Sequence, residues 1–169
     1  DLWRPNKKGD GTWGIFSCES AYAREYAYDG GIDDDGKIVG KIPQYIYNGE
    51  EGKFTEVTDL SNTFFRCTGL RIAPEIPGSV TRMESAFEGC TGLTTAPEIP
   101  NSVTYMYRTF LGCTNLTGKI TINANLNSST KWTYTDCFAG TTKPIQLTGT
   151  CPILSELAAT NSNGNVTVK

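Results

Sequence analysis

Three of the six cysteines recur at a fixed interval, which makes them the first candidates for chemistry. Cys67, Cys90 and Cys113 are each 23 residues apart. Thiolates at a regular spacing can hold a metal ion or exchange disulfides. They can equally form a ladder of buried, weakly polar side chains, with one rung in each repeat. Because parallel side chains keep their Cβ atoms near the spacing of stacked repeats, which is longer than a disulfide prefers, we favour the buried ladder.

The other three cysteines do not follow this interval. Cys137 and Cys151 are 14 residues apart near the C-terminus. They form a candidate disulfide that would staple a C-terminal cap, worth about 3 kcal/mol from loop entropy. Cys18 would then be left unpaired.

The chain has no histidine, which removes most routes to catalysis. A Ser-His-Asp triad, a Cys–His nucleophile pair and the common zinc sites that contain histidine are all excluded. Neither GxGxxG nor GxxxxGK[ST] occurs, so the usual phosphate-binding loops are absent from the sequence. The aspartates of the segment DGGIDDDG do not fit the register of a calcium loop, and we expect a solvated turn there. We therefore expect a protein that is not an enzyme and that holds no cofactor or metal.

The cysteine interval belongs to a longer internal repeat. Residues 67–89 and 90–112 are identical at 15 of 23 aligned positions. The element F-x-x-C-T-x-L occurs three times, and a fourth, weaker copy has Thr141 where the others have cysteine. A fixed period in this range is typical of a solenoid, because one unit cannot enclose a core alone and stacked units bury equivalent side chains in ladders. The predicted ladder residues are Phe64, Phe87, Phe110 and Phe138, with Cys67, Cys90 and Cys113.

The repeats must be built from short elements. Threonine and glycine are abundant, and the recurring segment L-x-x-A-P-E-I-P carries proline inside its predicted strand. Proline cannot donate to a strand ladder, so each strand must be short. The prediction is a repeat solenoid of three and a half units over residues 55–147, with short parallel strands, turns and short helices.

Irregular caps are predicted at both ends of this single domain. The N-terminal cap covers residues 1–54, with a helix over 18–28, an initial strand over 37–43, and a hairpin in which YIY and KFTEV flank NGEEG. The C-terminal cap covers residues 148–169, with a helix in ILSELAA and a terminal strand in NVTVK.

The charge and hydropathy patterns exclude two classes of partner. The formal net charge is −3 and the pI about 5.0, unlike the basic surface of a nucleic-acid-binding protein. No apolar run approaches the roughly 18 residues of a membrane-spanning helix. We expect no nucleic-acid partner and no membrane span in this segment.

The full repeat, L-x-x-A-P-x-I-P-x-S-V-x-x-M-x-x-x-F-x-G-C-T-x-L, resembles the BspA-like leucine-rich repeat of bacterial surface proteins. The resemblance covers about 90 of the 169 residues. It implies a short leucine-rich-repeat fold in an exported, extracellular protein on the bacterial cell surface. It also implies an adhesin-like role in binding a protein or glycan of a host or a neighbouring cell.

Positions that differ between the repeats are expected to be exposed. The third repeat places Tyr105, Tyr107 and Arg108 close together in the sequence. Tyrosine and arginine are enriched at protein interfaces, so these residues are the candidate interface. Ordinary surface with a partly buried tyrosine is the alternative.

A second function remains open beside adhesion. The chain begins abruptly at DLWRPNKKGDG, as a mature form would, and could be the structural head of a pilin-like or other filament subunit that self-assembles. Three Asn-X-Ser/Thr sequons, at Asn115, Asn127 and Asn165, are candidates for N-linked glycosylation in a suitable host.

Overall fold

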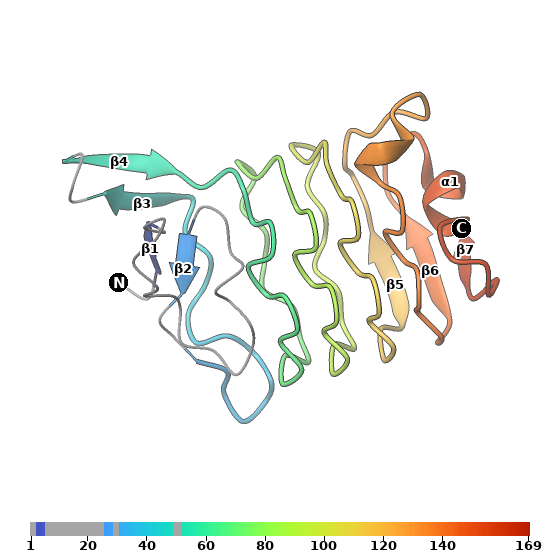
Figure 1. The fold of residues 1–169 in the computed structure, drawn as a ribbon, viewed down its shortest axis with the longest axis horizontal. Helices are drawn as coiled ribbons and strands as arrows, with labels where there is room; N and C mark the ends of the chain where they lie inside the picture. Colours follow the sequence, from blue (N-terminus) through green and yellow to red (C-terminus); the bar gives the residue numbers. More distant parts are fainter. Residues whose placement is uncertain (1–2, 6–25, 29–30, 49–51) are drawn as a thin grey trace.

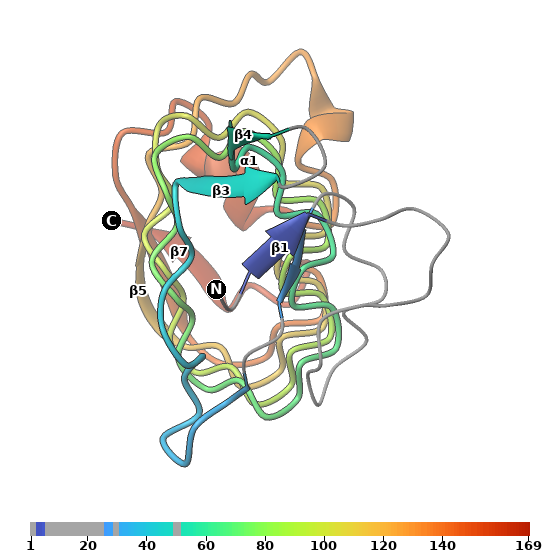
Figure 2. The ribbon, with the colours of Figure 1, turned by 90° about the vertical axis from the view of Figure 1, so that its left-hand side faces the viewer.

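The repeat units lie side by side along the long axis of the molecule. The structure is a computed structural model that describes residues 3–5, 26–28, 31–48 and 52–169. The N-terminal strands lie at one end of the row of repeats and the C-terminal elements at the other (Figure 1). Viewed along the row, the repeats overlie one another in nearly the same outline (Figure 2). The units therefore stack, as the sequence period predicts.

Backbone hydrogen bonds join each repeat to the next along one edge of the stack, which we call the ladder edge. Alternate N–H groups of one repeat donate to carbonyl groups of the following repeat at 2.6–3.1 Å. Equivalent positions of the second and third repeats make the same bonds. The donors of the first interface are Leu60, Asn62, Phe64 and Arg66, and their acceptors are Arg82, Glu84, Ala86 and Glu88.

Every repeat turns twice at residues with left-handed backbone conformation. The first turn uses residues other than glycine, with φ between 53° and 59° at Asn62, Ser85, Arg108 and Asp136. The second turn uses Arg66 in the first repeat and glycine in the others, with φ of 73–78° at Gly89, Gly112 and Gly140. Glycine adopts this conformation without steric strain, which explains its place in the F-x-G element. Since the first turn recurs in four repeats, its conformation belongs to the fold rather than to one site.

Four phenylalanines form a continuous stack through the core. Their side chains are fully buried, and neighbouring ring planes differ by only 5–14°. Ring centroids are 5.3 Å apart for Phe64–Phe87, 5.6 Å for Phe87–Phe110 and 5.4 Å for Phe110–Phe138. This is the phenylalanine ladder that the sequence predicts. It persists across the longer interval before Phe138, so the five extra residues of that repeat lie outside the core.

Aliphatic side chains fill the core in columns beside the phenylalanines. One column consists of isoleucines, one mainly of valines, and one of leucine and methionine, all buried. Their members are Ile76, Ile99 and Ile122; Val57, Val80, Val103 and Leu126; and Leu60, Met83 and Met106.

Regular strands form only at the C-terminal end of the stack. There β5 (Gly118–Thr121), β6 (Ile145–Thr148) and β7 (Val166–Val168) make a parallel sheet. In the earlier repeats the expected strands are reduced to isolated parallel bridges, such as Ile72–Thr95 and Ile99–Ile122. The prediction of a strand in every repeat is therefore wrong for these units. The prolines of the APEIP segments remove the N–H groups that a longer ladder would need.

The N-terminal part differs from its prediction in two places. Strands β1 (Trp3–Pro5) and β2 (Tyr26–Tyr28) pair antiparallel. The helix predicted over 18–28 is therefore wrong at its end, and the rest of it lies outside the described residues. The expected strand over 37–43 is only a single antiparallel bridge between Ile32 and Ile38. Alternating tyrosines suit a strand as well as a helix, which is why the pattern misled.

A hairpin projects from this end of the molecule (Figure 1). Strands β3 (Tyr45–Asn48) and β4 (Lys53–Glu56) pair antiparallel, with Tyr47 opposite Phe54. These are the two arms predicted from YIY and KFTEV. Ile46 is buried on one face, while Tyr47 and Phe54 lie on the exposed face.

The C-terminal end is closed by α1 (Leu154–Ala158) and by β7, where the sequence predicts a helix and a strand. The buried side chain of Asn161 joins this cap to the last repeat. Its Nδ2 donates to the Thr141 carbonyl at 2.6 Å and to Asn165 Oδ1 at 2.8 Å. The N–H of Phe138, at the end of the phenylalanine stack, donates to the Thr160 hydroxyl at 3.0 Å. Side chains of the cap thus provide hydrogen-bond partners for backbone groups of the last repeat.

Tyr134 introduces a hydroxyl into the core position that Leu60, Met83 and Met106 occupy in the other repeats. The residue is 4% exposed, and its hydroxyl has no hydrogen-bond partner among the described residues. We expect Tyr134→Phe to raise the free energy of unfolding by about 1 kcal/mol, because the desolvation penalty of the hydroxyl disappears. Urea unfolding measures this, with exposed Tyr45→Phe as the control. A clear loss of stability in Tyr134→Phe would show that the hydroxyl is hydrogen-bonded.

Candidate functional site

The three residues predicted to form an interface lie together at the ladder edge. Tyr105 forms a parallel bridge with Arg82, and Arg82 forms one with Asp59. These three residues hold the same position in successive repeats, so their side chains leave the stack side by side. Tyr107 and Arg108 follow on the same segment, and both are partly exposed. The stacking of repeats therefore gathers side chains that the sequence spaces 23 residues apart.

The Arg82 side chain covers one face of Tyr105. Its guanidinium carbon lies 4.0 Å from the centroid of the Tyr105 ring. The same guanidinium lies near two carboxylates, with Nη2 3.4 Å from Glu84 Oε2 and Nε 3.9 Å from Asp59 Oδ2. A cation over an exposed ring gains about 0.5–1 kcal/mol, and exposed ion pairs add little more. These contacts orient the guanidinium more than they stabilise the fold.

Trp132 extends the aromatic surface beyond Tyr105. The two ring centroids are 5.7 Å apart with the planes tilted by 56°, and Tyr105 also meets Tyr107 at 6.5 Å and 53°. Trp132 belongs to the 3-10 helix Lys131–Thr133, which begins at the last residue of the five-residue insertion 127–131. Its side chain is 64% exposed. The segment directly after the insertion therefore presents a large indole on the surface beside two tyrosines.

Arg108 repeats the arrangement of Arg82 on the neighbouring tyrosine. Its guanidinium carbon lies 5.0 Å from the Tyr107 ring centroid, and its Nε is 3.8 Å from Asp136 Oδ2. Arg108 and Asp136 both occupy the left-handed turn position of their repeats. Both guanidinium groups are thus held beside tyrosine rings, with N–H groups left over for a partner.

We call Arg82, Tyr105, Tyr107, Arg108, Trp132 and Asp136 the aromatic–arginine cluster. Its two guanidinium groups lie near three carboxylates, counting those of Asp59 and Glu84. Positive and negative charges are therefore nearly balanced. The cluster offers ring faces for stacking, N–H donors and carboxylate acceptors. Such a surface suits a partner recognised by apolar contact and hydrogen bonds better than a highly charged one.

Neither Trp132 nor Arg82 was among the predicted interface residues. Arg82 differs from Tyr105 in the aligned repeats, which marks it as exposed but does not reveal the contact between them. Trp132 stands where the other repeats have Thr58, Thr81 and Thr104, when the fourth copy is aligned backwards from Phe138. The signal that could have found it is the change from threonine to tryptophan at this aligned position, directly after the insertion.

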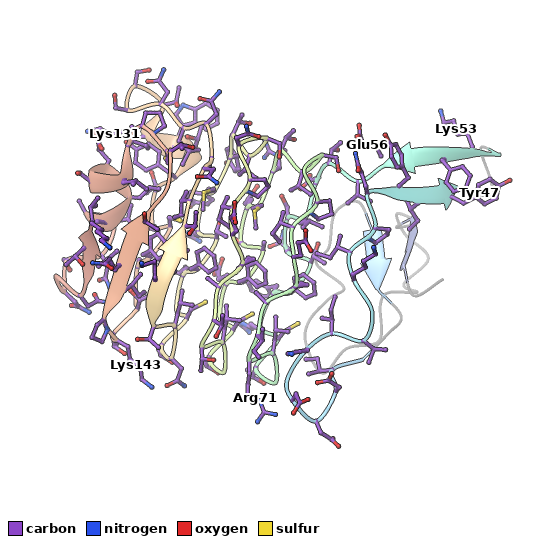
Figure 3. The ribbon with its side chains drawn as sticks, turned by 180° about the vertical axis from the view of Figure 1, so that it is seen from behind. Tyr47, Lys53, Glu56, Arg71, Lys131 and Lys143 are labelled. Atoms are coloured by element: carbon purple, nitrogen blue, oxygen red, sulfur yellow. The ribbon has the colours of Figure 1, made fainter. Side chains whose placement is uncertain are left out.

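A second group of exposed aromatic residues lies on the hairpin. Tyr45 is 55% exposed and Phe54 69%, and the Phe54 ring centroid is 5.3 Å from that of Tyr47. Figure 3 places Tyr47 at one end of the molecule and Lys131, the neighbour of Trp132, toward the other. The two exposed aromatic surfaces are therefore separate, and the hairpin offers matched controls for variants of the cluster.

The predicted cysteine rung is buried, but it is not a ladder of three thiols. Cys67, Cys90 and Cys113 are fully buried, and Cys67 is disulfide-bonded. The Cys90 and Cys113 thiols are free and donate to the carbonyls of Phe64 and Phe87, each at 3.0 Å. Repeat spacing keeps these two thiols apart, as the sequence analysis argued.

The candidate disulfide between Cys137 and Cys151 is wrong. Both residues are buried and free. Sequence separation alone says nothing about the direction of their Cβ atoms, and disulfide formation depends on that direction. The C-terminal cap is attached instead by the hydrogen bonds of Asn161 and by apolar packing of α1.

The free thiols should be unreactive in the folded protein. Burial raises the pKa of the Cys90 thiol to about 12 and also raises the pKa of Cys113, Cys137 and Cys151. Since the thiolate is the reactive form, a disulfide-exchange reagent near neutral pH should find almost no thiol in the native protein. Without reductant, denaturant should expose the thiols of Cys90, Cys113, Cys137 and Cys151, which are free in the described part of the chain. If only two of these thiols react after denaturation, the other two form a disulfide.

No group of three or more Cys, Asp or Glu residues in the described part of the chain could hold a metal ion. Asp33 Oδ1, in the predicted acidic turn, accepts from the N–H groups of Asp35 and Lys37. None of the described helices has the length and apolar character needed to cross a membrane.

Comparison with known proteins identifies the fold. No protein-family model and no curated protein matches the sequence. The crystal structure of a leucine-rich repeat protein from Bacteroides ovatus matches 88% of this chain with a TM-score of 0.50 and 19% sequence identity. The chain has a leucine-rich-repeat fold. It covers 36% of the length of the Bacteroides protein, and at this identity the similarity extends to the fold alone.

Within this leucine-rich-repeat fold, the aromatic–arginine cluster has a definite place. The buried columns are the recurring residues that define the repeat. The cluster is formed by residues that vary between repeats and by the insertion. A fold that keeps its core constant can thus carry a different surface on each repeat.

Proposed function

We propose that this chain is a surface-displayed protein-binding module that contacts its partner through the aromatic–arginine cluster. Its architecture in this proposal is a short BspA-like solenoid with irregular caps. The module acts by binding, without catalysis, in an exported adhesin-like protein on the bacterial cell surface. Support for the solenoid comes from the repeating core columns and ladder-edge hydrogen bonds, and support for export comes from the sequence motif.

The exposed indole of Trp132 is the observation that carries the proposal. Tryptophan, tyrosine and arginine are the residue types most enriched at the energetic centres of protein interfaces. Trp132, Tyr105 and Arg82 combine all three types in one contact group. Tyr105 is held from two sides, so little side-chain entropy remains to be lost on binding. A partner covering Trp132 would bury a large apolar surface that is otherwise in water.

Binding assays with matched variants test this role. The labelled protein is applied to arrays of host-cell and bacterial surface proteins and of glycans. For a hit that depends on the cluster, Trp132→Ala and Arg82→Ala should each weaken binding by about 30-fold, equivalent to about 2 kcal/mol. Tyr45→Ala, which removes an exposed ring from the hairpin, should leave it unchanged. Equal losses in all three variants would contradict a specific role for the cluster.

Immunogold electron microscopy of the source cells tests the location. Gold over the cell envelope supports surface display. Gold along filaments would favour the structural subunit instead, and the cluster should then be sought at contacts between copies. Gold confined to the cell interior would overturn the proposed location. A glycan as the only array hit would retain the binding module and change the class of partner.

A further inference from the structure

We propose that Asn127 is an acceptor site for N-linked glycosylation, and that the fold itself blocks the other two sequons. Asn115-Leu-Thr and Asn165-Val-Thr carry the same sequence signal as Asn127-Ser-Ser. The signal requires a free asparagine amide and a serine or threonine hydroxyl two residues later. The three sequons differ in how the fold treats these groups and the residue between them. This inference does not depend on the proposed binding role.

The middle residue separates the three sequons most clearly. In two of them this residue belongs to the core, since Leu116 is fully buried and Val166 is 6% exposed. A transferase must draw the sequon into its own active site, and here that movement would pull a core side chain into water. Ser128, between Asn127 and Ser129, is exposed. Only this sequon can leave the surface without opening the core.

The asparagine amides follow the same division. Asn115 Nδ2 donates to the Thr91 carbonyl at 2.7 Å, and Asn165 Nδ2 donates to the Lys143 carbonyl at 2.8 Å and to Thr141 Oγ1 at 3.1 Å. Asn127 Nδ2 donates to no group in the described part of the chain. Its Oδ1 accepts from the N–H and the hydroxyl of Ser129, at 2.9 and 2.8 Å. Asn127 is exposed, and its amide lies beside the hydroxyl that the signal requires.

The hydroxyls and backbone agree with this assignment. Thr117 Oγ1 donates to the Pro144 carbonyl at 2.8 Å, in the next repeat, and the Asn165 carbonyl accepts from the N–H of Ile145 at 2.9 Å. Hydrogen bonds of the Asn127 segment are local, as from Thr130 N–H to the Asn127 carbonyl at 3.0 Å. The segment belongs to the insertion, which adds no backbone bond to the ladder edge. It can be extended in a transferase while the stacked repeats stay intact.

The reaction is a group transfer from a lipid-linked oligosaccharide diphosphate. Asn127 Nδ2 forms a bond to C1 of the first sugar, and the bond from C1 to the diphosphate oxygen breaks. The lipid diphosphate leaves with the electron pair, and a base of the transferase takes one proton from the amide nitrogen. No oxidation or reduction occurs. The cell that produces this chain supplies the sugar donor and the transferase, and the chain supplies the acceptor asparagine.

Glycan transfer to the folded protein tests the site. The purified chain is incubated with a single-subunit oligosaccharyltransferase that accepts Asn-X-Ser/Thr and with a lipid-linked oligosaccharide, and occupancy is read by glycopeptide mass spectrometry. We expect modification of Asn127 to be at least about tenfold faster than modification of Asn115 or Asn165. The other two sequons must first leave the folded core, and a free-energy cost of about 1.4 kcal/mol for that step corresponds to a tenfold lower rate. Asn127→Gln and Ser129→Ala should both abolish the main product.

A denatured chain and matched variants complete the test. After reduction and alkylation all three sequons should be modified at comparable rates, which shows that the fold causes the difference. Asn115→Gln and Asn165→Gln should leave the product of the folded chain unchanged. The proposal is overturned if Asn127 is modified only in the denatured chain, or if either of the other sequons in the folded chain is modified as fast.

Discussion

Replacing Phe87 by alanine should lower the free energy of unfolding by about 3–5 kcal/mol. Phe87 is fully buried and stacks on Phe64 on one side and on Phe110 on the other. Alanine at this position removes both ring contacts and leaves a cavity that the neighbouring rings cannot fill without leaving their own rungs. Because a domain of this size is stable by about 5–15 kcal/mol, this single change should remove a large fraction of its stability. Urea unfolding followed by circular dichroism measures the loss.

An exposed phenylalanine provides the control for this prediction. Phe54→Ala, on the hairpin, removes a side chain that is 69% exposed and should change the stability by about 1 kcal/mol or less. Phe87→Leu keeps part of the volume and should fall between wild type and Phe87→Ala. If Phe87→Ala and Phe54→Ala cost the same, the phenylalanine stack does not support the core.

Asn161→Ala should lower the free energy of unfolding by about 2–3 kcal/mol, although it removes only one polar side chain. The residue is 7% exposed, and its Nδ2 donates to two groups of Thr141, the carbonyl at 2.6 Å and Oγ1 at 2.9 Å. It also donates to Asn165 Oδ1 at 2.8 Å. Alanine removes the shortest hydrogen bonds to the buried Thr141, which then accepts only the longer bonds from Asn163 and Asn165, and loosens the cap from the last repeat. Hydrogen exchange should therefore increase first at β7.

Asn163→Ala is the matched variant in the same segment. Asn163 is exposed, and its Nδ2 reaches the Thr141 carbonyl only at 3.4 Å. We expect its loss to change stability by about 0.5 kcal/mol or less. A loss in Asn163→Ala as large as in Asn161→Ala would mean that the cap is held by the whole loop rather than by one buried amide.

Residues that recur at one spacing were the most predictable part of the fold. Phe64, Phe87, Phe110 and Phe138 carry the same side chain at the same place in each repeat, so their alignment in sequence predicts their stacking in space. The same reasoning predicted burial of Cys67, Cys90 and Cys113. It failed for the paired state of the cysteines, because a bond between two sulfur atoms depends on Cβ directions that spacing does not determine.

Strand content was harder to predict than burial. Isoleucine beside proline favours an extended backbone, but the same prolines remove the N–H groups that would join one extended segment to the next. The segment GKIT of β5 has no proline and forms a regular strand. At the N-terminus, alternating tyrosines fitted a helix and a strand equally well, and only the pairing of β1 with β2 decides between them.

The candidate site was predicted in part, because comparison of aligned repeats shows which positions vary. Tyr105, Tyr107 and Arg108 differ from their counterparts in other repeats, which marks them as exposed. Contacts between repeats, such as Arg82 over Tyr105, follow once the units are stacked. Trp132 directly follows the insertion, so its position is found only when the fourth copy is aligned backwards from Phe138, where it replaces the threonine of the other repeats. The repeat period predicts the regular core well, but it does not predict which contacts form beside an insertion.

The ladder edge also determines how such a chain can change in evolution. Each interface uses the same alternate donors and the same acceptors, so a newly duplicated unit would meet its neighbours through bonds that already exist. An in-frame duplication of one whole repeat should therefore be tolerated, whereas a partial one would shift every donor away from its acceptor. The five-residue insertion is tolerated because it forms a loop between two segments of the ladder edge and leaves every donor opposite its acceptor. New surface chemistry can thus be acquired one loop at a time, while the stacked core changes only by whole repeats.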